Sequence, residues 1–121
     1  ALGVVTRAHR EEVRAALGRA GLAAQFKVLV TGESIDGDPA DPEAYRLALM
    51  ALNAEPPLPA RLIHPHEVLV IESREAALAA ARAAGLETVG VGRKGDPRLA
   101  AADQVVAFLC EIPLARLAAV S

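Results

Sequence analysis

The sequence predicts an α/β fold in which helices pack on a doubly wound, mostly parallel sheet of five strands. Short apolar runs alternate with helical patterns along all 121 residues. The pattern is clearest from His66 to Gly92, where an Ala-rich helical pattern that stops at Gly85 separates two apolar runs. Apolar residues make up 53% of the chain and aromatic residues only 2%, so Val, Leu, Ile and Ala must fill the core. A chain of this length is expected to form one domain, residues 1–121.

The expected elements follow from the apolar periodicity and from the residues that start and stop helices. Gly21 is expected to end the first helix as a C′ glycine. Asp41 and Pro42 are expected to begin the second helix as its N-cap and N1 residues. The pattern predicts strands over 2–6, 27–31, 68–71, 88–91 and 105–108, helices over 8–20, 42–52, 74–84 and 112–120, and a helical turn over 99–102.

Composition excludes several classes of protein. The net charge is −2, and the sequence has neither a basic run nor an aromatic platform, which argues against a nucleic-acid binder. No apolar run approaches the roughly 18 residues of a membrane span, and no signal peptide is visible. Cys110 is the single cysteine, so we expect no internal disulfide and a reducing cytoplasm. The first strand begins almost at residue 1, and we therefore expect further residues upstream.

Three other motifs lack the spacing that their chemistry requires. His64 and His66 stand two apart without a further ligand at a metal-binding spacing. The acidic loop from Glu33 to Asp41 lacks the ligand spacing and the terminal bidentate Glu of a Ca²⁺ loop, which favours a solvated loop. The glycines between 90 and 95 do not open a helix as a dinucleotide fingerprint would.

Four blocks of the chain match a known family in order and spacing: LGVVTRAHREEVRAALGRAGL, DPADPEAYRLAL, VLVIESREAALAAARAAGLETVGVG and AADQVVAFLCEI. Together they resemble the haloacid dehalogenase-like hydrolases, and within them the phosphoglycolate phosphatase and β-phosphoglucomutase subgroup. The resemblance covers nearly the whole chain. It implies a Rossmann-like core and Mg²⁺-dependent phosphoryl transfer through an aspartyl-phosphate, with a small phosphorylated ligand as the partner.

The resemblance assigns a phosphate-binding position to Thr6. The family holds a phosphoryl oxygen with a Ser or Thr hydroxyl at the end of a core strand, and Thr6 stands there, before a helix N-terminus that suits an oxyanion. The alternative is that Thr6 caps the helix, and both roles are compatible. Arg7 lies beside Thr6, where it either reaches a phosphate or is a solvated surface arginine.

The metal position is only half matched. In the family an acidic pair after a later strand fixes Mg²⁺, a hard cation that prefers carboxylate and water. Glu72 matches the first acid, and Ser73 falls on the Asp that would ligate the metal. Because a neutral hydroxyl is a poorer Mg²⁺ ligand, Glu72 and Ser73 are expected to form a degenerate metal site. Alternatively, Glu72 caps a helix or pairs with Arg74.

The family's lysine has no counterpart at its own position. By register that position falls near Asp38 or Pro39, where carboxylates line the loop and would repel a phosphate. Lys27, Arg93 and Lys94 are the candidates to supply the missing positive charge from elsewhere.

The family's nucleophile is also not found. No Asp-x-Asp pair follows a predicted strand. The resemblance implies that this pair lies upstream, before a helical cap, on a strand between the strands of Val4 and Val70. We therefore expect either that those two strands pair directly or that another chain fills the gap, with homo-oligomerisation as a consequence. Thr6, the Asp41–Pro42 helix start and Glu72 are expected at one rim of the sheet.

Two functions remain open from the sequence. The chain is either a phosphatase-type hydrolase core that is inactive by itself, because the nucleophile, the lysine and the metal-binding Asp are absent, or a catalytically degenerate binding or assembly module. The sequence indicates no substrate.

Overall fold

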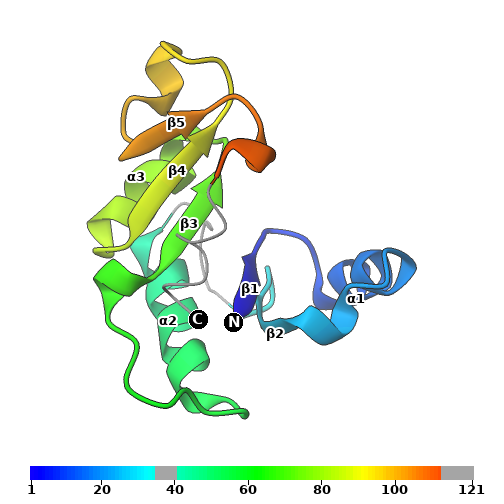
Figure 1. The fold of residues 1–121 in the computed structure, drawn as a ribbon. Coiled ribbons are helices and arrows are strands. Elements are labelled where there is room, and N and C mark those ends of the chain that lie inside the picture. Colours follow the sequence, from blue (N-terminus) through cyan, green and yellow to red (C-terminus); the bar gives the residue numbers. More distant parts are fainter. Residues whose placement is uncertain (35–40, 113–121) are drawn as a thin grey trace. The chain divides into compact units, whose positions relative to one another are not determined.

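A computed structural model describes residues 1–34 and 41–112 of the chain. The helix predicted over 112–120 and the lysine position near Asp38 lie outside these residues, apart from Ile112. In the described part, strands and helices alternate as predicted (Figure 1). The elements are β1 (Leu2–Val5), α1 (Arg10–Arg19), β2 (Phe26–Val30), α2 (Pro42–Ala54), β3 (Leu69–Glu72), α3 (Glu75–Ala83), β4 (Glu87–Val91) and β5 (Gln104–Val106). Short 3₁₀ helices are η1 (Ala23–Gln25), η2 (Pro65–Glu67), η3 (Pro97–Leu99) and η4 (Leu109–Glu111).

The chain divides into two compact units, residues 1–63 and 64–121. The first unit holds β1, α1, β2 and α2, and the second holds β3, α3, β4 and β5. Each unit has its own buried cluster of apolar side chains. The expectation that the whole chain forms one domain stays a prediction.

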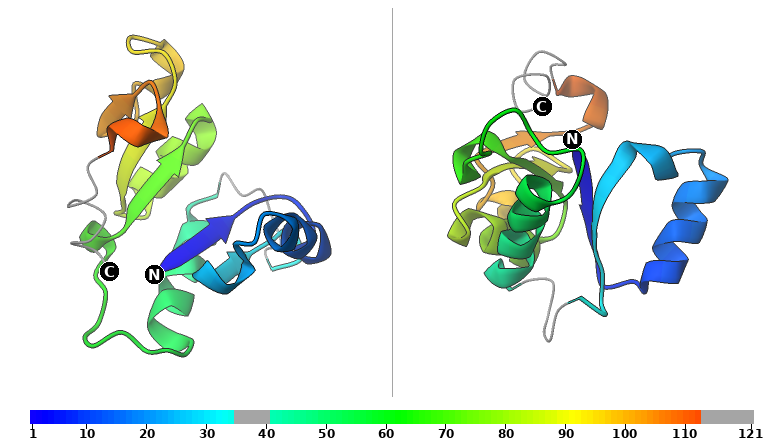
Figure 2. Two further views of the ribbon diagram at one scale, coloured as in Figure 1. Left: turned by 45° about the vertical axis from the view of Figure 1, so that its right-hand side comes forward. Right: turned by 90° about the horizontal axis from the view of Figure 1, so that it is seen from below.

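In the first unit, β1 and β2 pair in parallel, with Val4 opposite Leu29 and Val5 opposite Val30. The helix α2 packs on this pair, where Val28 and Val30 are buried against Ala44. The helices α1 and α2 lie on opposite sides of the two strands (Figures 1 and 2). Because the two strands run parallel, their carboxyl ends lie at one edge of this unit, and Thr6 follows directly at that edge.

In the second unit, β3, β4 and β5 form a parallel sheet in that order. The Ala-rich helix α3 covers one face and buries Ala77, Leu78, Ala80 and Ala81 (Figure 2). Small side chains allow this helix to approach the strands closely. Val89, Val106 and Ile112 form a further buried cluster.

The five predicted strands, their parallel pairing and the predicted helices that fall in the described residues, α1, α2 and α3, are confirmed. The strands are distributed over two sheets rather than joined in one, because among the described residues β1 pairs only with β2, and β3 pairs only with β4. Direct pairing of the strands of Val4 and Val70 is therefore not observed. One edge of β1 and one edge of β3 make no ladder with another strand in the described residues.

Local signals in the sequence set the helix ends correctly. Gly21 and Gly85 adopt φ of 71° and 84°, which glycine tolerates at a C′ position. Leu22 N–H donates to the Leu17 carbonyl at 2.8 Å and Leu86 N–H to the Ala81 carbonyl at 3.1 Å, closing both helices. Among the described residues, no helix is both long enough and apolar enough to cross a lipid bilayer.

Candidate functional site

Thr6 lies at the carboxyl end of β1, as the sequence predicted. Its backbone N–H donates to the Val30 carbonyl at 3.0 Å, so the residue is held against the end of β2. Its Oγ1 accepts the Ala8 N–H at 3.2 Å. Ala8 precedes both the N-cap residue His9 and the first helical residue Arg10. The hydroxyl therefore stabilises the turn before α1 and does not cap the helix itself. Arg7, next to it, is exposed.

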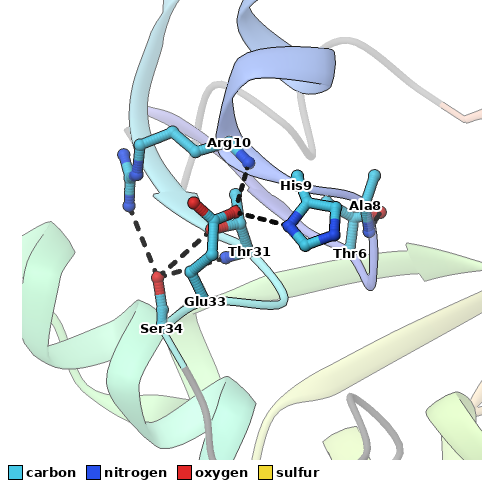
Figure 3. Close-up of polar contacts among 7 residues, drawn as sticks. All are labelled: Thr6, Ala8, His9, Arg10, Thr31, Glu33 and Ser34. Atoms are coloured by element: carbon cyan, nitrogen blue, oxygen red, sulfur yellow. Dashed lines mark hydrogen bonds and ion pairs between the residues drawn. The ribbon is translucent and has the colours of Figure 1, made fainter.

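The N-terminus of α1 is capped instead by Glu33, from the segment after β2 (Figure 3). Glu33 Oε1 accepts the Arg10 N–H at 2.6 Å and lies 3.3 Å from His9 Nδ1. Glu33 is therefore a helix-capping residue and not part of a cation loop. Its carboxylate takes the position at the helix N-terminus that a bound oxyanion would otherwise use.

Electrostatics at this contact favour the ionised carboxylate. The hydrogen bond from the Arg10 N–H lowers the pKa of Glu33; burial opposes this effect, and the nearby His9 and Arg10 side chains add to it. The net result is a pKa below the ordinary 4.5. Glu33 is thus negatively charged at neutral pH in the folded chain.

The segment after β2 also approaches the segment after β1 closely. Gly32 N–H donates to the Ala8 carbonyl at 3.1 Å. A Cβ at position 32 would lie 2.5 Å from the Arg7 carbonyl oxygen, so only glycine fits without a backbone shift. Arg10 adds a side-chain link, since its guanidinium donates to the Leu29 carbonyl at 2.9 Å. These contacts fix the geometry of the edge where Thr6 lies.

Glu72 is bound by the backbone that leads into α3 and by Arg74. Its Oε1 accepts the backbone N–H groups of Ser73 at 2.9 Å and Arg74 at 3.2 Å, and Arg74 Nη2 lies 3.3 Å from Oε2. Burial raises the pKa of Glu72, but the hydrogen bonds from Arg74 and from the two backbone N–H groups outweigh it, and the net pKa is below 4.5. The alternative in which Glu72 pairs with Arg74 is confirmed, whereas its backbone bonds go to Ser73 and Arg74, which precede the first helical residue Glu75, so Glu72 does not cap α3.

The residues around Glu72 do not fit a magnesium site. Both carboxylate oxygens of Glu72 already bind protein donors, and Ser73 contributes only a neutral hydroxyl. Within residues 1–34 and 41–112, no three His, Cys, Asp or Glu side chains gather as metal ligands would. Mg²⁺ prefers several oxygens, usually from carboxylates and water, and this donor set supplies none that is uncommitted. His64 and His66 stack their rings, with centroids 5.8 Å apart.

Of the three candidates for the missing lysine charge, Lys27 is ruled out by its place in the fold. It is the second residue of β2, so it lies at the amino end of the strand, away from the edge where Thr6 lies. Its Nζ donates to the carbonyls of Leu52 at 2.8 Å and Pro57 at 2.7 Å and so holds the C-terminal end of α2. Arg93 and Lys94 follow β4 at the carboxyl edge of the second sheet.

Thr6 and Glu72 each lie at the carboxyl edge of their own sheet. Asp41 begins α2 as predicted, with Oδ1 accepting the Glu43 N–H at 2.9 Å. A common rim for the three positions stays a prediction. Sequence reasoning missed the roles of Glu33 and Gly32. A glycine directly after a buried strand is a signal for close backbone approach and could have identified the second.

Comparisons with known proteins agree with this geometry. A family model described as haloacid dehalogenase-like hydrolase matches residues 1–91. The chain is 34% identical over 112 residues to validoxylamine A 7′-phosphate phosphatase of Streptomyces hygroscopicus subsp. limoneus, covering 92% of this chain and 48% of that protein. It is 31% identical over 90 residues to the pyrophosphatase PpaX of Bacillus pumilus, covering 74% of this chain and 38% of that protein.

A solved structure shows the same fold. CbbY from Rhodobacter sphaeroides, crystallised in complex with phosphate, superposes with a TM-score of 0.75 at 26% identity over 97% of this chain and 51% of that one. The chain thus spans about half the length of the proteins it matches. Since the family model covers most of the chain and the parallel α/β architecture agrees, the chain belongs to the haloacid dehalogenase-like hydrolases.

Proposed function

We propose that this chain is a phosphatase-type hydrolase core that binds a small phosphorylated ligand but does not by itself hydrolyse it. The observation that carries the proposal is the state of the metal position. The Arg74 side chain and the backbone N–H groups of Ser73 and Arg74, which precede α3, bind the carboxylate of Glu72, and Ser73 stands where the family has an acid. Family members generally use Mg²⁺, and a site without an uncommitted carboxylate supplies too little negative charge to hold it.

Phosphate binding in this proposal depends on Thr6. Because its Oγ1 accepts the Ala8 N–H, the hydroxyl oxygen is fixed in place while its proton can be donated to a phosphoryl oxygen. Arg7, the next residue in the chain, is exposed and adds positive charge to this segment. The relatives support a phosphorylated small molecule as the ligand, since one is described as a phosphatase of a 7′-phosphate and another structure contains phosphate. We include a cytoplasmic location in the proposal because the single cysteine, Cys110, is free.

The experiment measures Mg²⁺-dependent hydrolysis of p-nitrophenyl phosphate by the full-length gene product. We expect no activity above a blank for the natural sequence and measurable activity for Ser73→Asp, alone or combined with Asp38→Lys. Ser73→Asn is the matched control, because it has the size of Asp without the charge. Activity of the natural sequence that Ser73→Asn leaves unchanged would contradict the proposal.

The alternative function is a binding or assembly module whose catalytic site has degenerated beyond restoration. The Glu72–Arg74 pair favours it, because that contact stabilises the folded chain without needing a metal. In that case none of the variants hydrolyses the ester, and ligand binding by the natural sequence persists.

A further inference from the structure

A pocket opens in the second unit at the carboxyl edge of its parallel sheet. Its volume is about 650 Å³, and it is lined by Ser73, which follows β3, and by residues 91–99, which run from the end of β4 through η3. In open α/β sheets, ligands bind outside the carboxyl ends of the strands. The pocket therefore stands where the fold presents a ligand, and the role proposed for Thr6 does not involve it.

The lining of the pocket is cationic. It holds the side chains of Arg93, Lys94 and Arg98 and a single carboxylate, that of Asp96. Asp96 is neutralised by Arg98, whose Nη2 and Nε lie 2.9 and 3.2 Å from its two oxygens. Hydrogen bonds from Arg98 accordingly lower the pKa of Asp96. The lining, with three cations and one carboxylate, has a net charge of +2, and Arg93 also interacts electrostatically with Asp96.

Arg93 and Lys94 carry the positive charges that no ion pair holds. Both side chains are exposed, and within the described residues neither makes a side-chain hydrogen bond or an ion pair. Asp96 is bound to Arg98, which also interacts electrostatically with Glu75, and Arg93 interacts with Asp96 through space. An anion entering the pocket would meet Arg93 and Lys94 beside Ser73.

Backbone hydrogen bonds hold the segment that carries Arg93 and Lys94 in one conformation. Gly92 N–H donates to the Val106 carbonyl at 2.9 Å, and Asp96 N–H donates to the Arg93 carbonyl at 3.1 Å, closing a turn. A Cβ at position 92 would lie 2.9 Å from Cδ1 of the buried Leu99, and Gly95 adopts φ of 87°. Both glycines are needed for the turn, so Arg93 and Lys94 are held at the pocket by the fold.

We propose that this pocket binds a phosphate-class anion, either free phosphate or the second anionic group of a substrate that carries two. The second source rests on the proposed function, whereas anion binding itself does not. A net charge of +2 with Ser73 beside it matches the charge and hydrogen-bond acceptors of one phosphate group. An aromatic base-stacking surface is not present among the lining residues, so the pocket does not fit a nucleic acid.

The test is a titration of the full-length protein with inorganic phosphate in Mg²⁺-free buffer at constant ionic strength, followed by ¹⁵N–¹H NMR. We expect saturable shifts of the amides of Ser73 and residues 92–95. The double variant Arg93→Gln with Lys94→Gln should weaken binding by about tenfold, because both positive charges that no ion pair holds are removed. Arg19→Gln, an exposed arginine in the last turn of α1, is the matched control and should leave binding unchanged.

A further variant is expected to raise the affinity for phosphate instead of lowering it. Asp96→Asn removes the carboxylate that neutralises Arg98 while keeping an oxygen that can accept the Arg98 N–H, and it should tighten phosphate binding several-fold. Unchanged binding in the double variant, or phosphate shifts confined to other residues, would overturn the proposal. Far-UV circular dichroism of each variant checks that the fold is retained.

Titrations of the natural full-length protein with two esters separate the two sources of the anion. If the ligand is part of the substrate, the two Gln substitutions weaken binding of a bisphosphate ester and leave binding of a monophosphate ester unchanged. If the ligand is free phosphate, the affinities for both esters stay the same while the NMR-detected phosphate affinity falls. Failure of hydrolysis in all variants affects the proposed function alone, because the titration needs no turnover.

Discussion

At the scale of single residues, the carboxylate of Glu33 connects the two strand–helix junctions of the first unit. It accepts the Arg10 N–H from 23 positions away and stabilises the start of α1, where a negative charge interacts favourably with the helix dipole. We expect Glu33→Gln to lower the thermal midpoint of unfolding at pH 7 by a few degrees. Glu55→Gln, which removes another exposed carboxylate, is the control.

The same contact has a predicted pH dependence. The pKa of Glu33 is lower in the folded chain than its ordinary value of 4.5, so its stabilising contribution is present above that value and is lost as the pH falls through the folded pKa. Urea unfolding of the natural chain and of Glu33→Gln should therefore differ at pH 7 and converge in acid. A difference that persists or grows in acid would show that the carboxylate charge is not the cause.

Gly32 provides a steric test at the same edge. Gly32→Ala would place a Cβ against the Arg7 carbonyl and should destabilise the chain by about 1–3 kcal/mol, the usual cost of overpacking a fixed site. A Cβ at Gly18 in α1 would meet nothing within 4 Å, so Gly18→Ala should stabilise by about 0.5–1 kcal/mol. Chemical denaturation should show that Gly32→Ala lowers the free energy of unfolding and that Gly18→Ala raises it.

At the scale of elements, a side-chain network joins β4 to the segment that precedes β5. Asp103 Oδ2 accepts the Thr88 N–H at 2.8 Å and the Thr88 hydroxyl at 3.1 Å, and Asp103 N–H donates back to Thr88 Oγ1 at 3.0 Å. Thr88 is fully buried. The pair therefore supplies hydrogen-bonding groups that the interior of the sheet would otherwise leave unsatisfied.

Asp103→Ala should accordingly destabilise the second unit by about 2–4 kcal/mol, because a buried N–H and hydroxyl both lose their acceptor. Arg82→Gln should cost less than about 1 kcal/mol, since the Arg82–Asp103 ion pair is exposed and 3.5 Å long. Equal effects of the two substitutions in urea unfolding would show that the ion pair, and not the link to Thr88, carries the stability.

The elements themselves could be predicted from the sequence because their signals are local. Apolar runs placed the strands, Gly21 and Gly85 ended helices, and Asp41 with Pro42 began one. The contacts of Glu33 with Arg10 and of Asp103 with Thr88 could not be predicted in this way, since they join residues 23 and 15 positions apart. Lys27 could have been placed correctly, because the second residue of a strand lies at its amino end.

At the scale of the whole molecule, the distribution of strands over two sheets leaves unpaired edges among the described residues. Such edges can pair with another chain. We expect the molecular mass from light scattering to rise with protein concentration. A mass that stays at the monomer value over the whole range of protein concentration would show that the protein does not form homo-oligomers.

The resemblance predicted the family and a degenerate metal position at Glu72 and Ser73, but it left open which of its alternatives Glu72 adopts. The order of four sequence blocks was sufficient for the fold, because packing depends on the spacing of apolar residues. Metal binding, by contrast, depends on the two side chains at positions 72 and 73. Whether they can hold Mg²⁺ is decided by the local chemistry of Glu72, Ser73 and Arg74. The chain therefore combines a family fold with a metal position that does not fit Mg²⁺.

That claim is tested most directly by paramagnetic line broadening with Mn²⁺ as a substitute for Mg²⁺, observed at the amides of residues 72–75 in the full-length protein. Ser73→Asp provides the positive control. We expect no selective broadening of these amides in the natural sequence and clear broadening in Ser73→Asp. Selective broadening in the natural sequence at substoichiometric Mn²⁺ would contradict it.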